Sequence, residues 1–148
     1  MATVRDLLTR KANVRPDVLT VHPAATVMEA VQLMVDHGIG GLPVVDADGA
    51  LVGIFTERDL LRRVVAERRD VTGTDVESVM TRGVVVGGLA TPIDECAALM
   101  TARRLRHLPI VDDARLVGML TIGDILATQV DEQQVTITEL HRYVFDLR

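Results

Sequence analysis

Hydrophobic and polar positions along the chain run through the same series of periodicities twice. In the first half, apolar residues between Thr26 and Gly38 recur at intervals of three and four, which predicts an amphipathic helix that stops at the glycine. Two short apolar runs then flank a turn sequence, Asp-Ala-Asp-Gly, a pattern typical of a β-hairpin. The predicted elements of this unit are a strand at Val18–Val21, a helix at Val27–His37, strands at Leu42–Asp46 and Leu51–Phe55, and a helix from Glu57 to about Arg68.

The second half repeats this order. Residues 29–46 and 95–112 agree at 7 of 18 ungapped positions, and residues 51–61 and 116–126 agree at 6 of 11. The displacement changes from 66 to 65 residues inside the hairpin turn, where insertions are tolerated. The predicted elements of the second unit are a strand near Val84–Val86, a helix at Pro92–Arg104, strands at Leu108–Val111 and Leu116–Leu120, and a helix from Ile122 to about Gln129.

Each unit therefore has the order β-α-β-β-α, which predicts an α/β (α+β) fold. One unit is too small to cover its own apolar face, so we expect the two to pack through their sheets about a pseudo-twofold axis. A short helix at Asp75–Met80 is expected to link them. The predicted division is an N-terminal segment 1–17, a first motif 18–70, a linker 71–82, a second motif 83–130 and a C-terminal segment 131–148.

The chain ends are expected to add helices outside the repeat. Val4–Leu8 has a weak helical pattern, and Glu132–Leu147 has a stronger one with an imperfect apolar stripe. That stripe has two interpretations, packing on its own motif or contact with a second subunit, and the sequence leaves both open.

Composition narrows the class of protein. Aromatic residues make up only 2% of the chain, so the core is aliphatic and lacks platforms for stacking nucleic-acid bases. A net charge of −5 gives no overall basic footprint for DNA or RNA. The single cysteine, Cys96, excludes an intramolecular disulfide and is expected to be a buried, inert thiol, and the histidines lack metal-ligand spacing. No apolar run has the length of a membrane span, and the N-terminal stretch lacks a secretory apolar region, so we expect a soluble cytoplasmic protein.

A Thr-x-x-Asp signature opens the last helix of each motif, at Thr56–Asp59 and Thr121–Asp124. One interpretation is structural, because threonine followed by an acid three residues later forms a capping box. The other is functional: a helix start offers N–H groups to an anion, and the carboxylate accepts hydrogen bonds from two neighbouring sugar hydroxyls. A glycine in the preceding strand would let the backbone approach a ligand. The functional interpretation predicts a ribose-phosphate compound.

These motifs resemble the CBS motif, which is named for cystathionine β-synthase. An E-A-h-x-L-M helix, an h-P-V/I-V-D strand, an L-V-G strand and a T-x-x-D helix start each occur twice, with small departures, over about residues 18–130. The pair resembles a CBS-pair (Bateman) module. That resemblance implies two clefts between the copies that take AMP, ADP or ATP, with S-adenosylmethionine or NAD as alternatives, and association into a homodimer.

The same resemblance implies which residues bind the ligand. Asp59 and Asp124 match ribose-binding aspartates, and Thr56 and Thr121 match hydroxyls beside the phosphate. The other implied cleft residues are Val21, His22 and Val86 at the first-strand edges, and Gly41, Leu42, Pro43, Leu108 and Pro109 in and before the Leu-Pro strands.

Basic residues distinguish the two copies. Arg106 and His107 precede the second Leu-Pro pair, where the first copy has Gly40 and Gly41. We therefore expect two unequal sites, with the phosphate held more firmly by Arg106 and His107. The two glycines either admit a bulky group or allow close packing. Arg58 is a further candidate for a phosphate contact, its alternative being an exposed helix residue.

Two functions fit these observations. The first is a regulatory, ligand-sensing module that transmits a conformational or oligomeric change to an unidentified effector protein. The second is a structural dimerisation or scaffold module in which the threonines and aspartates only cap helices. An enzyme is disfavoured because no nucleophile and general base recur in a common arrangement.

Overall fold

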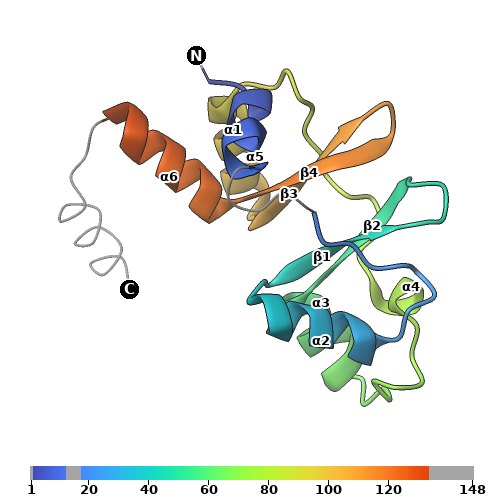
Figure 1. The fold of residues 1–148 in the computed structure, drawn as a ribbon. Helices are drawn as coiled ribbons and strands as arrows, with labels where there is room; N and C mark the ends of the chain where they lie inside the picture. Colours follow the sequence, from blue (N-terminus) through green and yellow to red (C-terminus); the bar gives the residue numbers. More distant parts are fainter. Residues whose placement is uncertain (1, 13–17, 134–148) are drawn as a thin grey trace, which may run out of the picture.

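The computed structural model describes residues 2–12 and 18–133, which form two similar halves (Figure 1). The elements that precede the second repeat are α1 (Val4–Ala12), α2 (Val27–His37), β1 (Gly41–Val45), β2 (Leu51–Thr56), α3 (Glu57–Asp59), the π-helix η1 (Leu60–Val65) and α4 (Val76–Val79). The later elements are α5 (Ile93–Arg103), β3 (His107–Asp112), β4 (Arg115–Thr121) and α6 (Ile122–Gln133). The C-terminal helix predicted at Glu132–Leu147, with both interpretations of its stripe, lies almost wholly outside the described residues.

The first helix of each motif forms as predicted. At the start of α2, the Thr26 hydroxyl accepts the Glu29 N–H at 3.1 Å, and the Glu29 carboxylate accepts the Thr26 N–H at 3.3 Å, a complete capping box. Gly38 ends α2 with a φ of 62°, a left-handed conformation that glycine adopts without strain. α5 also ends in a left-handed residue, Arg104, and begins one residue after its proline cap, Pro92.

The paired strands are confirmed as two antiparallel hairpins, β1–β2 and β3–β4, each with an irregularity at the equivalent position. The additional strands predicted at Val18–Val21 and near Val84–Val86 are wrong in extent. The first is a single parallel bridge, Val21 to Val44, while residues 84–86 form none and the corresponding bridge joins Gly87 to Ile110. The extended backbone ends there because a turn follows at once, with the Ala25 N–H donating to the carbonyl of His22.

The helix predicted to run to Arg68 is shorter and wider than expected. After one turn of α-helix it continues as η1, in which the Ala66 N–H donates to the Leu61 carbonyl five residues earlier. Arg68 then takes a left-handed φ of 55°, and the next N–H returns to the Val64 carbonyl, which ends the helix. The linking helix, predicted at Asp75–Met80, is the single turn α4.

Each hairpin packs on its own aliphatic core, and each core includes a short helix from outside the β-α-β-β-α unit. In the first core that helix is α4, whose Val76 and Val79 are at most 1% exposed. In the second core it is α1, with Val4 fully buried and Leu7 5% exposed. The start of α1 is bonded to the segment that leads into α5, because the Val4 N–H donates to the Thr91 carbonyl and the Ile93 N–H donates to the Ala2 carbonyl, although these residues are far apart in the sequence.

The two short helices occupy equivalent places. Thr3, just before α1, forms an antiparallel bridge with Pro92, and Asp75, just before α4, forms one with Thr26. Positions 26 and 92 correspond in the repeat. α1 therefore occupies the place on the second motif that α4 occupies on the first. The weak helical pattern at the N-terminus did not indicate this packing, and the predicted domain boundaries stay a prediction.

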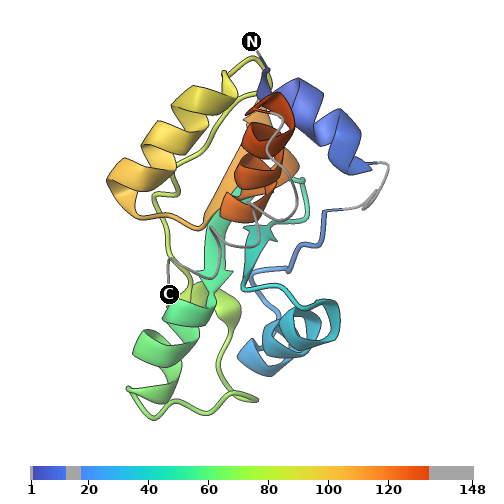
Figure 2. The same cartoon turned by 90° about the vertical axis from the view of Figure 1, so that its left-hand side faces the viewer.

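The pseudo-twofold arrangement is confirmed by contacts between equivalent residues. Ala50 forms a bridge with Arg115, 65 residues later. A Cβ added to Gly41 would lie 3.3 Å from the ring of His107, 66 residues later. When equivalent positions of two copies touch each other, the axis that relates the copies passes between them. The strands of the two halves accordingly meet in the middle of the molecule, with helices at both ends (Figure 2).

Candidate functional site

The Thr-x-x-Asp signature forms a capped helix start in both motifs. In the first, Asp59 Oδ2 accepts the Thr56 N–H at 3.0 Å, and the Asp59 N–H donates to the Thr56 hydroxyl oxygen at 3.3 Å. In the second, the corresponding distances between Thr121 and Asp124 are 2.9 and 3.1 Å. The interpretation of the signature as a helix cap is therefore confirmed. A role of the same side chains in ligand binding stays a prediction.

Each helix start lies beside the start of its Leu-Pro strand. The Glu57 N–H donates to the Gly40 carbonyl at 3.0 Å, and the Ile122 N–H donates to the Arg106 carbonyl at 3.2 Å. Gly41 is the register partner of Thr56. The structure thus brings together the threonines, the aspartates and the residues at the strand starts, as the sequence predicts.

Several of the predicted cleft residues are buried within the protein, among them Val21 and both Leu-Pro pairs. Val21 is 5% exposed and both of its backbone groups are hydrogen-bonded, to the Pro43 carbonyl and the Val45 N–H. The side chains of Leu42 and Leu108 are fully buried in the two cores. Pro43 and Pro109 are also buried, in the centres of the strands. The two leucines pack in the cores, and a ligand contact for these five residues stays a prediction.

Four of the residues predicted for ligand binding have exposed side chains. His22 is exposed, and its Nδ1 atom accepts the Ala24 N–H at 3.0 Å within a turn. Arg58 and Arg106 are exposed as well. Val86 is 39% exposed, but Gly87 is the residue that bridges to the sheet as Val21 does. Val86 thus stands one position before the residue that corresponds to Val21, and its ligand contact stays a prediction.

His107 crosses from the second motif to the first. Its Cε1 and Nδ1 atoms lie 3.3 Å from the point where a Cβ of Gly41 would stand, and Cε1 lies 3.6 Å from that point on Gly40. The paired glycines therefore allow close packing of the imidazole, the second of the two possibilities left open by the sequence. The half-buried His107 lies at the boundary between the motifs, close to Thr56.

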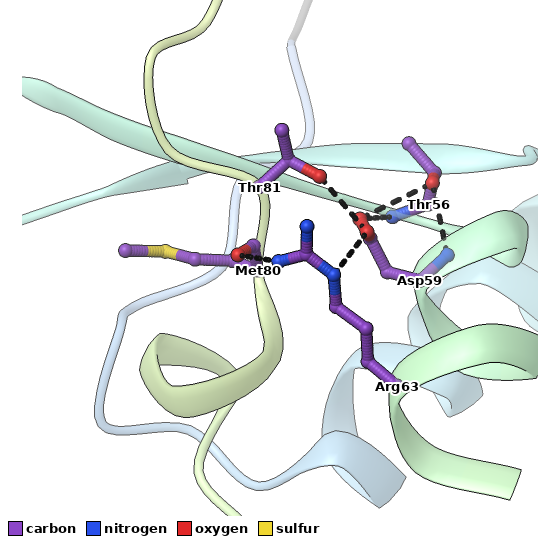
Figure 3. Close-up of polar contacts among 5 residues, drawn as sticks. All are labelled: Thr56, Asp59, Arg63, Met80 and Thr81. Carbon is purple, nitrogen blue, oxygen red and sulfur yellow. Dashed lines mark hydrogen bonds and ion pairs between the residues drawn. The ribbon is translucent and has the colours of Figure 1, made fainter. Parts of the chain in front are cut away.

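The second carboxylate oxygen of Asp59 joins its helix to the linker (Figure 3). Asp59 Oδ1 accepts the Thr81 hydroxyl at 2.8 Å and lies 3.6 Å from Arg63 Nε. The Arg63 guanidinium also donates from Nη1 to the Met80 carbonyl at 2.8 Å. Asp59 is only 6% exposed, and its charge is balanced by this arginine and by hydroxyl and N–H donors.

Sequence reasoning missed Arg63 and Thr81. Arg63 stands four residues after Asp59, a spacing that places the two side chains on one helix face and could have indicated the ion pair. Thr81 lies 22 residues away across the linker, and no local pattern connects it with Asp59.

The glycines in β2 and β4 are packed against other segments of the chain. A Cβ on Gly53 would lie 2.5 Å from Met80 Sδ and 2.9 Å from the Thr81 carbonyl oxygen. On Gly118, a Cβ would lie 2.6 Å from Leu8 Cδ1. The predicted approach of ligand to backbone at these glycines is therefore wrong: the space is taken by the segments that carry α4 and α1.

Within residues 2–12 and 18–133, no cluster of histidine, cysteine or acidic side chains has the makings of a metal site. Among the helices of the same residues, none is long and apolar enough to cross a bilayer.

Comparison with known proteins identifies the family. The CBS domain model matches residues 4–66 and 76–131, which begin at the first residues of α1 and α4. The CBS domain-containing protein YhcV of Bacillus subtilis is 36% identical over 133 residues, which are 90% of this chain and 89% of YhcV. A solved CBS-domain structure from Burkholderia ambifaria is 41% identical with a TM-score of 0.83, covering 92% of this chain and 99% of that one. The chain belongs to the CBS domain family and contains a pair of CBS motifs.

Two further solved structures in this family contain adenosyl ligands. The CBS domain pair of protein MJ0100, solved with 5′-methylthioadenosine and S-adenosyl-L-methionine, is 31% identical with a TM-score of 0.76, covering 89% of this chain and 98% of that one. CBSX2, solved with AMP, is 29% identical with a TM-score of 0.70, covering 80% and 92%.

Proposed function

We propose that this protein is a regulatory module that binds an adenine nucleotide or a related adenosyl compound between its two CBS motifs. The observation that carries the proposal is the repeated helix start, in which an aspartate and a threonine stand beside a strand start on both sides of the pseudo-twofold axis. Carboxylates accept hydrogen bonds from sugar hydroxyls, and arginine pairs with phosphate. Relatives of similar fold bind AMP or S-adenosyl-L-methionine, which supports the assignment.

The proposal is tested by thermal shift and calorimetry with AMP, ADP, ATP, S-adenosylmethionine and NAD, using protein refolded from denaturant to remove any bound ligand. A ligand of the native state stabilises it by about 2.7 kcal/mol at a concentration 100 times Kd. CMP serves as the control for the base. Absence of heat and of a thermal shift with every adenosyl compound would refute the proposal.

Arg106 offers a test of phosphate recognition. Because it is an exposed cation beside the start of α6, Arg106→Ala should weaken binding of AMP more than binding of adenosine. Arg103→Ala, another exposed arginine, is the matched control at the end of α5. Equal affinity of wild type and Arg106→Ala for AMP would contradict the role of Arg106.

The alternative, a structural dimerisation module, is favoured by one observation: the capping boxes account for the threonines and aspartates without any ligand. Homodimer formation and an effector partner are proposals from the family resemblance. Light scattering after size-exclusion chromatography should give twice the chain mass, with and without AMP. A dimer without any adenosyl binding would support the alternative, and a monomer under all conditions would refute it.

A further inference from the structure

Exposed apolar side chains are concentrated on the helices of the first motif. Among the residues that the structure describes, three large apolar side chains are more than half exposed: Val35 on α2 at 69%, and Leu61 and Val65 on η1 at 63% and 57%. Both helices pack on the same core, and in Figures 1 and 2 they lie at the end of the molecule opposite the second motif. Large apolar side chains that are exposed together on one part of a surface indicate an interaction site.

On each helix the exposed residues follow a regular spacing. Met28, which is 40% exposed, and the half-buried Val31 precede Val35 at intervals of three and four residues. Leu61 and Val65 are four residues apart on η1. Apolar residues at these intervals share one side of a helix, and such a side is what a second helix packs against.

The second motif does not repeat this surface. Val35 corresponds to Thr101 and Met28 to Asp94, each 66 residues later on α5, and both of these polar residues are exposed. Leu61 corresponds to Leu126, which is half-buried on α6. The exposed apolar surface therefore belongs to the first motif and does not follow from the repeated fold.

The C-terminal tail, residues 134–148, has a sequence pattern that matches this surface. It lies outside the described residues. Four of its apolar residues recur at intervals of three, four and three positions, the spacing of one helix stripe: Ile137, Leu140, Val144 and Leu147. Two of the three aromatic residues of the chain, Tyr143 and Phe145, are also in the tail. Aromatic residues are enriched at protein interfaces, so the tail has the composition of a contact segment.

The direction of α6 favours a second copy of the chain as the source of the tail. In Figures 1 and 2, α6 runs away from the first motif, and its C-terminal end lies far from α2 and η1. The 15 residues that follow would make a helix about 22 Å long. To reach the first motif of its own chain, this helix would have to fold back past the second motif. The first motif of another copy can be placed against it without such a reversal.

We propose that the protein forms a homodimer in which the C-terminal tail of each copy packs as a helix on Val35, Leu61 and Val65 of the other copy. The exchange is reciprocal, so one twofold rotation creates two identical contacts. This inference rests on the homodimer proposed above and names its contact surfaces. It does not depend on adenosyl binding.

Light scattering after size-exclusion chromatography of the full chain gives the first readout. Wild type should have twice the chain mass of 16.1 kDa. The variant V35E/L61E, which places charges on the first-motif surface, and the variant L140E/V144E, which places them on the tail stripe, should each have the single-chain mass. Val35 and Leu61 are exposed, so their replacement leaves the core unchanged, and circular dichroism checks that each variant is folded.

Each double variant has a matched control. Thr101→Glu changes the exposed residue that corresponds to Val35 in the second motif. Thr138→Glu changes the side of the predicted tail helix opposite Leu140. Both controls should remain dimers.

Cross-linking identifies which copy the tail contacts. Cys96 is 1% exposed, so a flexible bismaleimide should react selectively with cysteines that are added at the surface. An equal mixture of Val35→Cys and Val144→Cys chains, one of them lengthened by a tag, should give a product that contains one chain of each size. A mixture of Thr101→Cys with Val144→Cys should give much less of it.

Three results would overturn the inference: a monomeric wild type, a dimer that persists in folded V35E/L61E or L140E/V144E, or no mixed product from Val35→Cys with Val144→Cys. If a glutamate variant is unfolded, the cross-linking decides the question alone. None of these measurements involves a nucleotide, so calorimetry with AMP decides the proposed function independently.

Discussion

Replacing Gly53 by alanine should destabilise the first motif, because there is no space for one methyl group in β2. The added Cβ would lie 2.5 Å from Met80 Sδ, 2.9 Å from Met80 Cγ and 2.9 Å from the carbonyl oxygen of Thr81. The methionine side chain can rotate away, but the carbonyl cannot. It accepts the Ile54 N–H at 3.0 Å, and the Thr81 N–H donates back to Ile54 at 2.8 Å, so movement breaks this bridge.

The magnitude follows from two opposing effects. Overpacking of a tight site costs about 1–3 kcal/mol. Alanine recovers about 0.5–1 kcal/mol relative to glycine in a strand, because the unfolded chain loses conformational freedom. The expected net loss for Gly53→Ala is about 1–2 kcal/mol, which lowers the melting temperature of a chain of this size by roughly 2–8 °C.

Gly118→Ala is the matched control supplied by the repeat. A Cβ at Gly118 would meet only the Leu8 side chain, with its nearest atoms at 2.6 and 2.7 Å, and no backbone atom is among its three nearest neighbours. Its expected loss is smaller, about 0–1 kcal/mol. The assay is thermal and urea unfolding followed by circular dichroism. A Gly53→Ala variant as stable as wild type, or a Gly118→Ala variant that loses as much, would show that the backbone contact does not decide the cost.

Three further substitutions test local features. Thr26→Ala removes a capping box and should lower the free energy of unfolding, measured in urea, by about 1 kcal/mol. Thr101→Ala loses only a hydroxyl bond within α5 and should lower it distinctly less. Equal losses in the two variants would contradict the capping argument. Burial raises the pKa of the Cys96 thiol above its ordinary 9.0, so the unfolded chain loses this proton at a lower pH than the folded chain does. The free energy of unfolding should therefore fall as the pH rises past 9, and the Cys96→Ala variant should lack this fall. Slow alkylation of the native wild-type thiol checks that it is buried. Hydrogen bonds from Thr3 lower the pKa of Asp6, so the stability that this carboxylate contributes is present above the unfolded pKa of 3.8 and is lost as the pH falls through the lower folded value. Asp6→Asn should therefore melt at a lower temperature than wild type at pH 7 but at the same temperature at about pH 2. A difference in melting temperature that persists in acid would refute the assignment.

Local sequence patterns predicted the elements whose formation depends on near neighbours. The capped start of α2, its end at Gly38 and both hairpins follow from residues a few positions apart. The segment Val18–Val21 has strand-forming residues, yet it pairs only at Val21, because pairing also needs a partner strand and the chain turns immediately afterwards. Propensity indicates which conformation a segment tolerates, while the partner decides how much of it pairs.

The candidate site shows the same division. The cap between Thr56 and Asp59 is a four-residue motif and could be predicted. The bond from Thr81 to Asp59 and the packing of His107 against Gly41 join segments that only the tertiary fold brings together. The repeat nevertheless contains a usable signal for the second contact: where one copy has two glycines, the other has two large basic residues, and such complementary differences are expected at positions that meet across a pseudo-twofold axis.

The packing of α1 and α4 ties the two motifs together more closely than the sequence repeat implies. In the repeat, each copy begins with a short helix, at Val4 and at Val76. In the structure, α1 completes the core of the second motif and α4 completes the core of the first, so each copy supplies its first helix to the other. Neither repeat, cut out at its sequence boundaries, therefore contains a complete core. Because Thr81 follows α4 directly and bonds to Asp59, the exchanged segment also reaches the capped start of α3, whereas its counterpart Thr9 lies within α1 and bonds to that helix. The two exchanged helices differ in length, since α4 ends at Val79 and α1 continues to Ala12, which is why Thr81 lies beyond its helix and Thr9 within one.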